Sequence, residues 1–328
     1  MDVEEQICWK IISDKFRLTF ETFYFVTLRY VCMILIAVTC SPYKYRIYHL
    51  RLLTYTEPRA VFGLTTLKDK IFVVIDELAF IVVYTSQAPY TRLPNLSING
   101  MKWPIDITAG SSCLYITDPC SAAIWRVKAV HNKVDQWLSA VRAMSVSVTS
   151  EEKLVLLVVV DSQGSVAERN WNHYCEIHVY SSGAVKETVI KLSRDITTPF
   201  HAILTTRKTF IVSYGADWHA VNRVCEVDMT GRMLKAFGSA PGEGVGQLNR
   251  PFHVSLDDEE RIIVADAFNR RVLLLNKQLM LQRVLVTWND PQSHIDGARR
   301  PSRLHYDRHS GRLLVGLVGH IDIYQLRY

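Results

Sequence analysis

A short frame of strands and turns recurs along most of the chain, and this recurrence constrains the fold more than any other feature. In its best copy, β-branched and apolar runs at 251–256, 262–266 and 272–275 are separated by turns. Such runs are typical of three antiparallel strands. The frame returns at 104–127 and 199–228, and the tripeptide proline-phenylalanine-histidine opens two of the three copies. The pattern predicts stacked all-β repeats rather than an ordinary sandwich.

Three weaker copies, at 70–84, 153–180 and 312–324, complete a set of six. Successive second strands begin about 40 to 55 residues apart, which is the period of four-stranded propeller blades. Radial stacking of such blades covers both faces of each small sheet and leaves only short edges. The sequence therefore predicts an all-β, six-bladed β-propeller over residues 45–328.

Closure of the ring requires a fourth strand for the last repeat. The last repeat stops after three strands at Tyr328, so its outer strand has to come from elsewhere. A β-rich stretch at 47–56 lies just before the first repeat. We predict that this stretch is the closing strand.

Residues 1–44 differ from the repeats and form a divergent N-terminal extension. An apolar run at 23–40 is interrupted by Arg29, and only 31–39 is uncharged and mostly apolar. A transmembrane helix needs about 20 apolar residues, and a signal peptide has a basic rather than an acidic start. Two main interpretations stay open: a loosely packed or helical extension, and a membrane signal-anchor through 23–40. An uncleaved or misassigned leader is a third.

Composition indicates a soluble globular protein, with 48% hydrophobic and 21% charged residues. The formal net charge of +6 is too mild to imply nucleic-acid binding by itself. Seven cysteines are scattered and include no C-x-x-C pair. That usage is typical of reduced thiols and predicts a cytoplasmic protein, although one glycosylation sequon begins at Asn95. Membrane anchoring through the N-terminal run is the alternative location.

The stretch 237–251, continuing into 264–266 and 269–272, resembles the NHL repeat. Asn269, Arg270 and Arg271 stand where that family has its namesake Asn-His-Leu triplet, so the resemblance is to the fold more than to the signature. It implies a propeller of the tripartite-motif type, but the chain carries no RING or B-box array of cysteines and histidines. A role in ubiquitin ligation would then need a ligase on another polypeptide.

Four polar residues follow a proline by two positions at the predicted start of an inner strand: Asp106, His201, His253 and Arg303. Such positions face the channel mouth of a propeller. Imidazole and carboxylate groups from several blades are typical divalent-metal ligands, so Asp106, His201 and His253 are candidates for a channel metal. The alternative is an ordinary polar lining, and on that interpretation no cofactor is expected.

Motifs for catalysis are missing from the sequence. It has no G-x-S-x-G elbow and no cysteine with an evident activating neighbour, so we assign no catalytic residue. Glycines at 242, 244 and 246 precede Pro251 and a strand rather than a helix, which favours an interblade connection over a phosphate cradle. Asp118 and Asp266 enter tight turns and are predicted to accept backbone N–H groups there.

Basic residues cluster in the last two repeats, where aromatic residues are nearby in sequence. This pattern predicts an RNA-facing surface, and the alternative is a solvated rim paired with acidic residues. The candidate partner-binding or RNA-binding residues are Arg270, Arg271, Arg299, Arg300, Arg303 and Arg308.

Three classes of function follow from the sequence. The leading one is a non-catalytic scaffold, a monomeric propeller whose loops bind a protein partner. The second is substrate recognition for ubiquitin ligation, with the ligase in another chain. The third group comprises an RNA-binding propeller and a channel-metal hydrolase or lyase.

Overall fold

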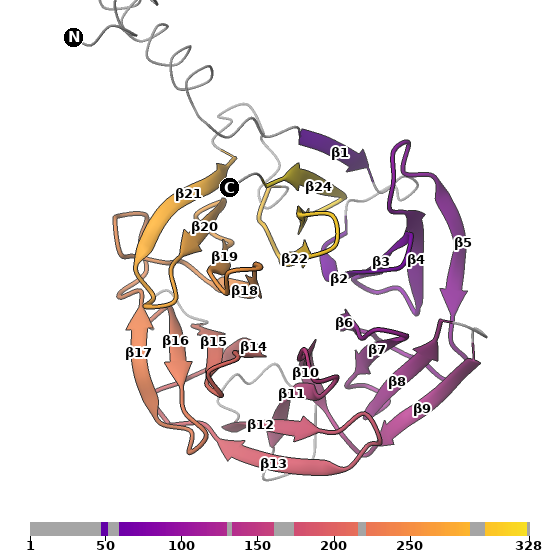
Figure 1. Ribbon diagram of the computed structural model, residues 1–328, viewed down its shortest axis with the longest axis horizontal. Coiled ribbons are helices and arrows are strands. Elements are labelled where there is room, and N and C mark those ends of the chain that lie inside the picture. Colours follow the sequence, from indigo (N-terminus) through magenta and orange to yellow (C-terminus); the bar gives the residue numbers. More distant parts are fainter. Residues whose placement is uncertain are drawn as a thin grey trace, which may run out of the picture. The chain divides into compact units, whose positions relative to one another are not determined.

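The protein is described by a computed structural model, and every regular element of its described residues is a β-strand (Figure 1). The described residues are 47–51, 59–129, 133–160, 174–215, 221–288 and 299–326. They form six four-stranded antiparallel sheets that are arranged as blades in a ring. The predicted all-β, six-bladed propeller with four-stranded blades is confirmed.

The first three blades each run in chain order from an inner to an outer strand. Blade one comprises β2 (Val61–Leu67), β3 (Lys70–Ile75), β4 (Phe80–Thr85) and β5 (Arg92–Ser97). Blade two comprises β6 (Asp106–Ala109), β7 (Cys113–Asp118), β8 (Ala123–Lys128) and β9 (Lys133–Ser139). Blade three comprises β10 (Ala143–Val148), β11 (Leu154–Val160), β12 (Tyr174–Tyr180) and β13 (Lys186–Lys191).

The next two blades repeat this order, and the sixth supplies only three strands of its own. Blade four comprises β14 (Pro199–Leu204), β15 (Phe210–Tyr214), β16 (Arg223–Val227) and β17 (Met233–Phe237). Blade five comprises β18 (Pro251–Leu256), β19 (Ile262–Asp266), β20 (Arg271–Leu275) and β21 (Leu281–Thr287). Blade six comprises β22 (Arg303–Asp307), β23 (Arg312–Gly316) and β24 (His320–Gln325).

The ring is closed by β1 (Ile47–Arg51), which is the outer strand of blade six. It pairs antiparallel with β24, from Ile47 opposite Tyr324 to Arg51 opposite His320. The predicted closing strand is confirmed over 47–51, while 52–56 lie outside the described residues. β1 covers the outer edge of β24, so blade six has four strands like the other five blades.

The hydrophobic core lies between neighbouring blades rather than at one central point. Second strands are buried on both faces because each blade is covered by the next, as in β3 and β19. Outer strands are more exposed; β13 and β17 expose most of their residues. One apolar cluster, for example, joins Leu157 of blade three to Phe210 of blade four. This layered packing fixes the inner strands in position around the axis.

Neighbouring blades are also tied together by the turns between their first and second strands. The Glu152 carboxylate accepts the backbone N–H of Ser111 at 2.9 Å, and Lys208 Nζ lies 2.8 Å from Glu151. Between blades four and five, Glu260 accepts hydrogen bonds from the backbone N–H and hydroxyl of Thr206, each at 2.7 Å. These contacts hold adjacent blades together at their turns.

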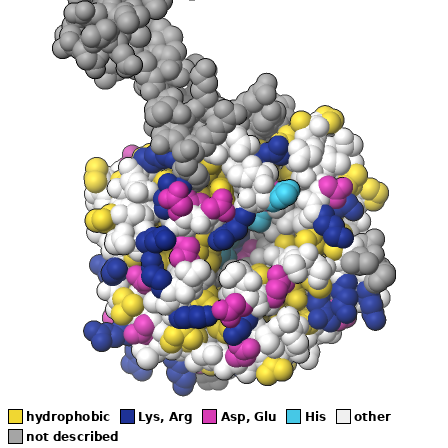
Figure 2. All heavy atoms as spheres, viewed as in Figure 1, with side chains coloured by type: hydrophobic (Ala, Val, Ile, Leu, Met, Phe, Trp, Pro, Cys, Tyr) yellow, Lys and Arg dark blue, Asp and Glu magenta, His cyan; other side chains and the backbone are white. Residues whose placement is uncertain are grey.

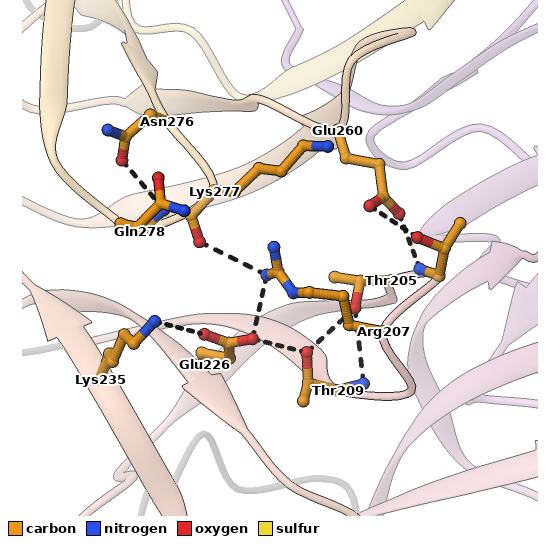
Figure 3. Close-up of polar contacts among 10 residues, drawn as sticks. Thr205, Arg207, Thr209, Glu226, Lys235, Glu260, Asn276, Lys277 and Gln278 are labelled. Atoms are coloured by element: carbon orange, nitrogen blue, oxygen red, sulfur yellow. Dashed lines mark hydrogen bonds and ion pairs between the residues drawn. The ribbon is translucent and has the colours of Figure 1, made fainter.

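Figure 3 shows how the same boundary is reinforced by a buried carboxylate. Glu226 accepts a hydrogen bond from Arg207 at 3.0 Å and one from the Thr209 hydroxyl at 2.7 Å. The Arg207 guanidinium also donates to the backbone carbonyl of Lys277 in blade five, at 3.4 Å. Arg207 therefore bridges two blades.

The aspartates predicted to be structural do hold turns, as expected. Asp118 accepts the backbone N–H groups of Lys102 and Trp103 at 2.7 and 3.1 Å. Asp266 accepts that of Asn249 at 2.7 Å and pairs with Arg271 at the same distance. Both carboxylates thus pin the connection that enters their blade. In the turn that follows, Asp118 accepts the backbone N–H of Ser121 at 3.2 Å as predicted, whereas Asp266 accepts the Asn269 side-chain amide at 2.8 Å.

The glycine run at 242–246 lies in the connection between β17 and β18. The Arg271 guanidinium donates to the carbonyls of Glu243 and Gln247, at 2.8 and 2.9 Å, and the Asn269 amide donates to that of Gly242 at 2.7 Å. No helix follows the glycines; β18 does. The predicted interblade connection is confirmed.

The predictions for residues 1–44 lie outside the described residues. Within the described ranges, no helix has the length and apolarity needed to cross a membrane.

Candidate functional site

Six equivalent positions lie on the inner strands, one in each blade, and we call them the axial ring. Each pairs with the equivalent residue of the second strand, as His253 does with Ala265 in blade five. The axial ring comprises Gly63, Asp106, Ser145, His201, His253 and Arg303. In four blades a register shift immediately precedes the position, and such a bulge re-aims the next side chain.

The structure brings the three predicted metal ligands together. Asp106, His201 and His253 each offer a ligand atom, and these atoms lie within 4.8 Å of one another. The three residues are only 1%, 3% and 7% exposed. The two imidazole rings stack with centroids 3.8 Å apart and planes inclined by 29°. Three blades therefore converge on one buried polar cluster.

Asp106 is held by the backbone on both of its oxygens. Its Oδ1 accepts the N–H of Ile107 at 2.9 Å, and its Oδ2 accepts that of Val146 in the next blade at 3.0 Å. The Nε of Arg303 lies 3.8 Å from Oδ1. The carboxylate is therefore fixed in place and partly balanced by a guanidinium.

Arg303 reaches this carboxylate from blade six, past blade one. Its guanidinium donates to the carbonyl of Ser302 at 2.9 Å and to that of Ile105 in blade two at 3.4 Å. Blade one contributes no side chain to the axial ring, because a Cβ on Gly63 would lie only 2.9 Å from two atoms of Ile107. Glycine at this position allows close contact between blades one and two. The Arg303 side chain then extends across this position from blade six to blade two.

Burial dominates the electrostatics of the cluster. It lowers the pKa of His201 to about 3 and that of His253 well below its usual value, and the positive charge of Arg303 acts in the same direction. Burial also raises the pKa of Asp106 to about 6, against the opposing effect of Arg303. At neutral pH the site therefore holds two neutral imidazoles and one carboxylate.

A further histidine of blade six lies near the axial ring but has a different environment. The Nε2 of His305 accepts the backbone N–H of Thr66 at 3.2 Å and lies 2.8 Å from the Thr66 hydroxyl. Burial lowers the pKa of His305 to about 4. His305 thus joins blades six and one as a partly buried histidine with its hydrogen bond satisfied.

Sequence reasoning found four members of the axial ring and missed Ser145 and Gly63. The four that it found follow a proline by two residues, whereas these two follow Ala143 and Val61. The second strands supply the missing signal, since β11 and β3 are recognisable from their apolar runs. Counting back across the hairpin from them would have located both positions.

The six arginines proposed for RNA binding do not all lie on one surface. Arg303 lies in the axial ring, and Arg271 is committed to Asp266 and the glycine-rich connection. Arg300 lies over the Phe268 ring, with its guanidinium carbon 4.0 Å from the ring centroid.

The remaining candidates are also distributed. Arg308 is exposed on the turn after β22, at the opposite end of that strand from Arg299 and Arg300. Arg270 lies in the turn between β19 and β20 of blade five. RNA binding stays a prediction.

Exposed large hydrophobic side chains are distributed unevenly around the ring. Among the described residues all nine fall in blades three to five or their connections, and six of these lie on the hairpins that carry the outer strands. These six are distributed two to a blade over three neighbouring outer hairpins, and we call them together the outer hairpin patch: Val185, Val189, Met229, Leu234, Met280 and Val284. Their exposed fractions run from 42% to 63%. Figure 2 shows charged side chains of both signs interspersed over one face, with hydrophobic ones along its edge.

The fold places the chain in the class of six-bladed β-propellers. Virginiamycin B lyase from Staphylococcus aureus is similar, with a TM-score of 0.58, 10% identity and coverage of 87% of this chain and 100% of that one. A gluconolactonase from Xanthomonas campestris gives 0.60, 12%, 86% and 90%, and the WD40 propeller domain of Doa1 gives 0.52, 12%, 85% and 97%. At such low identities the likeness shows the fold alone.

No family model matches the chain, and no curated protein matches it. Membership of the NHL-repeat family therefore stays a prediction, while the propeller that the resemblance implied is established by the structure. The similar structures include enzymes as well as a WD40 domain, so the fold by itself does not choose between catalysis and binding.

Proposed function

We propose that the chain is a protein-binding scaffold whose partner docks on the outer hairpin patch. The observation that carries this proposal is the restriction of exposed large hydrophobic side chains to blades three to five. Each of three neighbouring outer hairpins presents two of these side chains, so a partner segment that extends across the three blades contacts all six. A closed ring whose blades are tied at their turns presents such side chains on a rigid support.

The charges beside the patch indicate the chemistry of the partner. Among the charged residues of the outer strands β13, β17 and β21 and of the turns that precede them, Lys and Arg outnumber Asp and Glu. The basic ones are Lys186, Lys191, Arg232, Lys235, Lys277 and Arg283, and the acidic ones are Glu187 and Asp228. A protein segment with apolar anchor residues flanked by acidic residues is complementary to this surface. We therefore propose an acidic, amphipathic protein segment as the occupant.

Affinity purification of the tagged full chain tests this function. We expect a stoichiometric protein partner to co-purify with the unaltered chain and to be lost with Leu234→Asp or Met280→Asp, because each change introduces a like charge to the acidic flanks. Val245→Asp is the matched control, since Val245 is 93% exposed but lies outside the patch. Thermal unfolding of each variant checks that the fold is intact.

Two outcomes would overturn the proposal. One is a partner that binds the patch variants as well as the unaltered chain, and the other is bound material that is released by ribonuclease. A partner that carries a RING domain would support the narrower role in substrate recognition for ubiquitin ligation, which stays a prediction.

A further inference from the structure

The polar cluster of the axial ring has the donor set of a transition-metal site. Asp106 supplies a carboxylate, and His201 and His253 supply imidazoles. Nitrogen and oxygen donors of this kind bind zinc and neighbouring divalent metals. The ligand atoms of a tetrahedral zinc ion lie about 3.3 Å apart, given metal–ligand distances of about 2.0–2.1 Å. Small side-chain rotations would bring the three atoms, now within 4.8 Å of one another, to that separation.

A second observation sets these histidines apart from a polar lining. The Nδ1 atoms of His201 and His253 are buried and have no hydrogen-bond partner in the part of the chain that the structure describes. Buried polar atoms in folded proteins are almost always satisfied. His305 is the contrast, because its Nε2 accepts a backbone N–H from Thr66. Two adjacent imidazoles that each have an unpaired ring nitrogen point to a bound species, such as a metal ion, that accepts their lone pairs.

We propose that Asp106, His201 and His253 form a binding site for one divalent transition-metal ion, of which zinc is the best fit. Three protein ligands leave a fourth coordination position, as in zinc sites that bind an exogenous ligand. The Arg303 guanidinium, 3.8 Å from the Asp106 carboxylate, favours an anion in that position. This site is separate from the outer hairpin patch, and neither proposal depends on the other.

The Asp106 carboxylate is held in place by the protein on both of its oxygens. The two backbone N–H groups that hold this carboxylate also orient it, which is how metal ligands are commonly supported.

The test is a cobalt and zinc titration of the purified full chain after treatment with a chelator. We expect one equivalent of Co²⁺ per chain, with the visible absorption of a four-coordinate ion, and its displacement by Zn²⁺. His201→Ala and His253→Ala should each weaken Zn²⁺ binding by about 100-fold, and Asp106→Asn by about 10-fold or more. His305→Ala, which changes a partly buried histidine outside the cluster, should leave the affinity unchanged.

X-ray absorption of the cobalt-loaded unaltered chain decides the question even if a variant does not fold. A coordination shell with two imidazole nitrogens supports the site. A shell of oxygen alone, a shell that contains sulfur, or no uptake of Co²⁺ or Zn²⁺ at all would overturn it. Equal affinity in the folded His201→Ala and His305→Ala proteins would also overturn it.

Discussion

Blades three and five adopt the same four-stranded sheet but hold their second strands by different means. At one equivalent position blade five has Asp266, opposite Pro251, and blade three has Val158, opposite Ala143. Asp266 is anchored to the incoming connection by a backbone N–H and a guanidinium, whereas Val158 packs within an apolar cluster. The comparison teaches that a blade can be fixed by a buried charge or by apolar packing alone.

The charged anchor of blade five should give the largest mutational effect. Asp266→Ala leaves the Arg271 guanidinium, which is mostly buried, without its carboxylate, and removes the acceptor for Asn249. Removing one partner of such a pair costs about 3–5 kcal/mol in the free energy of unfolding. Urea denaturation measures this loss, with Asp266→Asn as the milder control. A loss below about 1 kcal/mol would show that the anchor is dispensable.

The apolar second strand of blade three should respond almost as strongly. Leu156 is fully buried within the same cluster as Val158. Leu156→Ala should cost about 3 kcal/mol, because it removes buried methyl groups and leaves a cavity. Leu156→Met keeps the volume and should cost less than about 1.5 kcal/mol. Equal losses in the two variants, measured by urea denaturation, would contradict this explanation.

The two blades should also differ in their response to pH, through their axial-ring residues. The pKa of His253 in blade five lies well below 6.5 in the folded protein, so below pH 6.5 the unfolded chain binds a proton that the folded protein does not. Stability contributed by this group is lost as pH falls, at up to about 1.4 kcal/mol per pH unit. Ser145 in blade three does not titrate.

The measurement is unfolding free energy between pH 4.5 and 7.5. His253→Gln should flatten the acid side of the profile, whereas Ser145→Ala should leave its slope unchanged. Asp106 contributes with the opposite sign, because its pKa is raised from 3.8 to about 6 and the folded protein keeps that proton longer. An unchanged slope in His253→Gln would show that this histidine does not titrate on unfolding.

The smallest effects should come from the outer strands, where the two blades become alike. Val189 in β13 and Val284 in β21 occupy corresponding exposed positions. Val189→Ser and Val284→Ser should each change the free energy of unfolding by less than about 0.5 kcal/mol. A thermal unfolding series measures both. A larger loss in only one would mean that the outer strands, too, are held differently.

The sequence carried enough information to predict the architecture, because β-branched runs and turns report local structure directly. Blade five was recognised from its turn residues, including Asp266, and blade three from the apolar runs of β11 and β12. The closing strand β1 followed from counting strands rather than from any motif. The NHL family assignment stays a prediction, because Arg270 and Arg271 depart from the signature of that family.

The candidate site was predicted in part. Proline marked the inner-strand positions of Asp106, His201 and His253, but their convergence depends on how three separate blades pack, which no local pattern encodes. Ser145 and Gly63 were missed for want of that proline. Arg271 binds the glycine-rich connection, and Arg303 extends past Gly63 to blade two. Both contacts join residues that are distant in the sequence, so the clustering of basic residues in the sequence predicted these two arginines to lie on the surface.

The pairing of β1 with β24 has a consequence for how the protein is made. The two partners lie at opposite ends of the described chain, so the ring cannot close until the last blade has emerged from the ribosome. Until then β24 has an unpaired edge, which is the kind of surface on which nascent chains aggregate. Contacts this distant in sequence also slow folding. The pairing of these five residues with β24 is thus the step that protects the newly synthesised protein from aggregation through this edge.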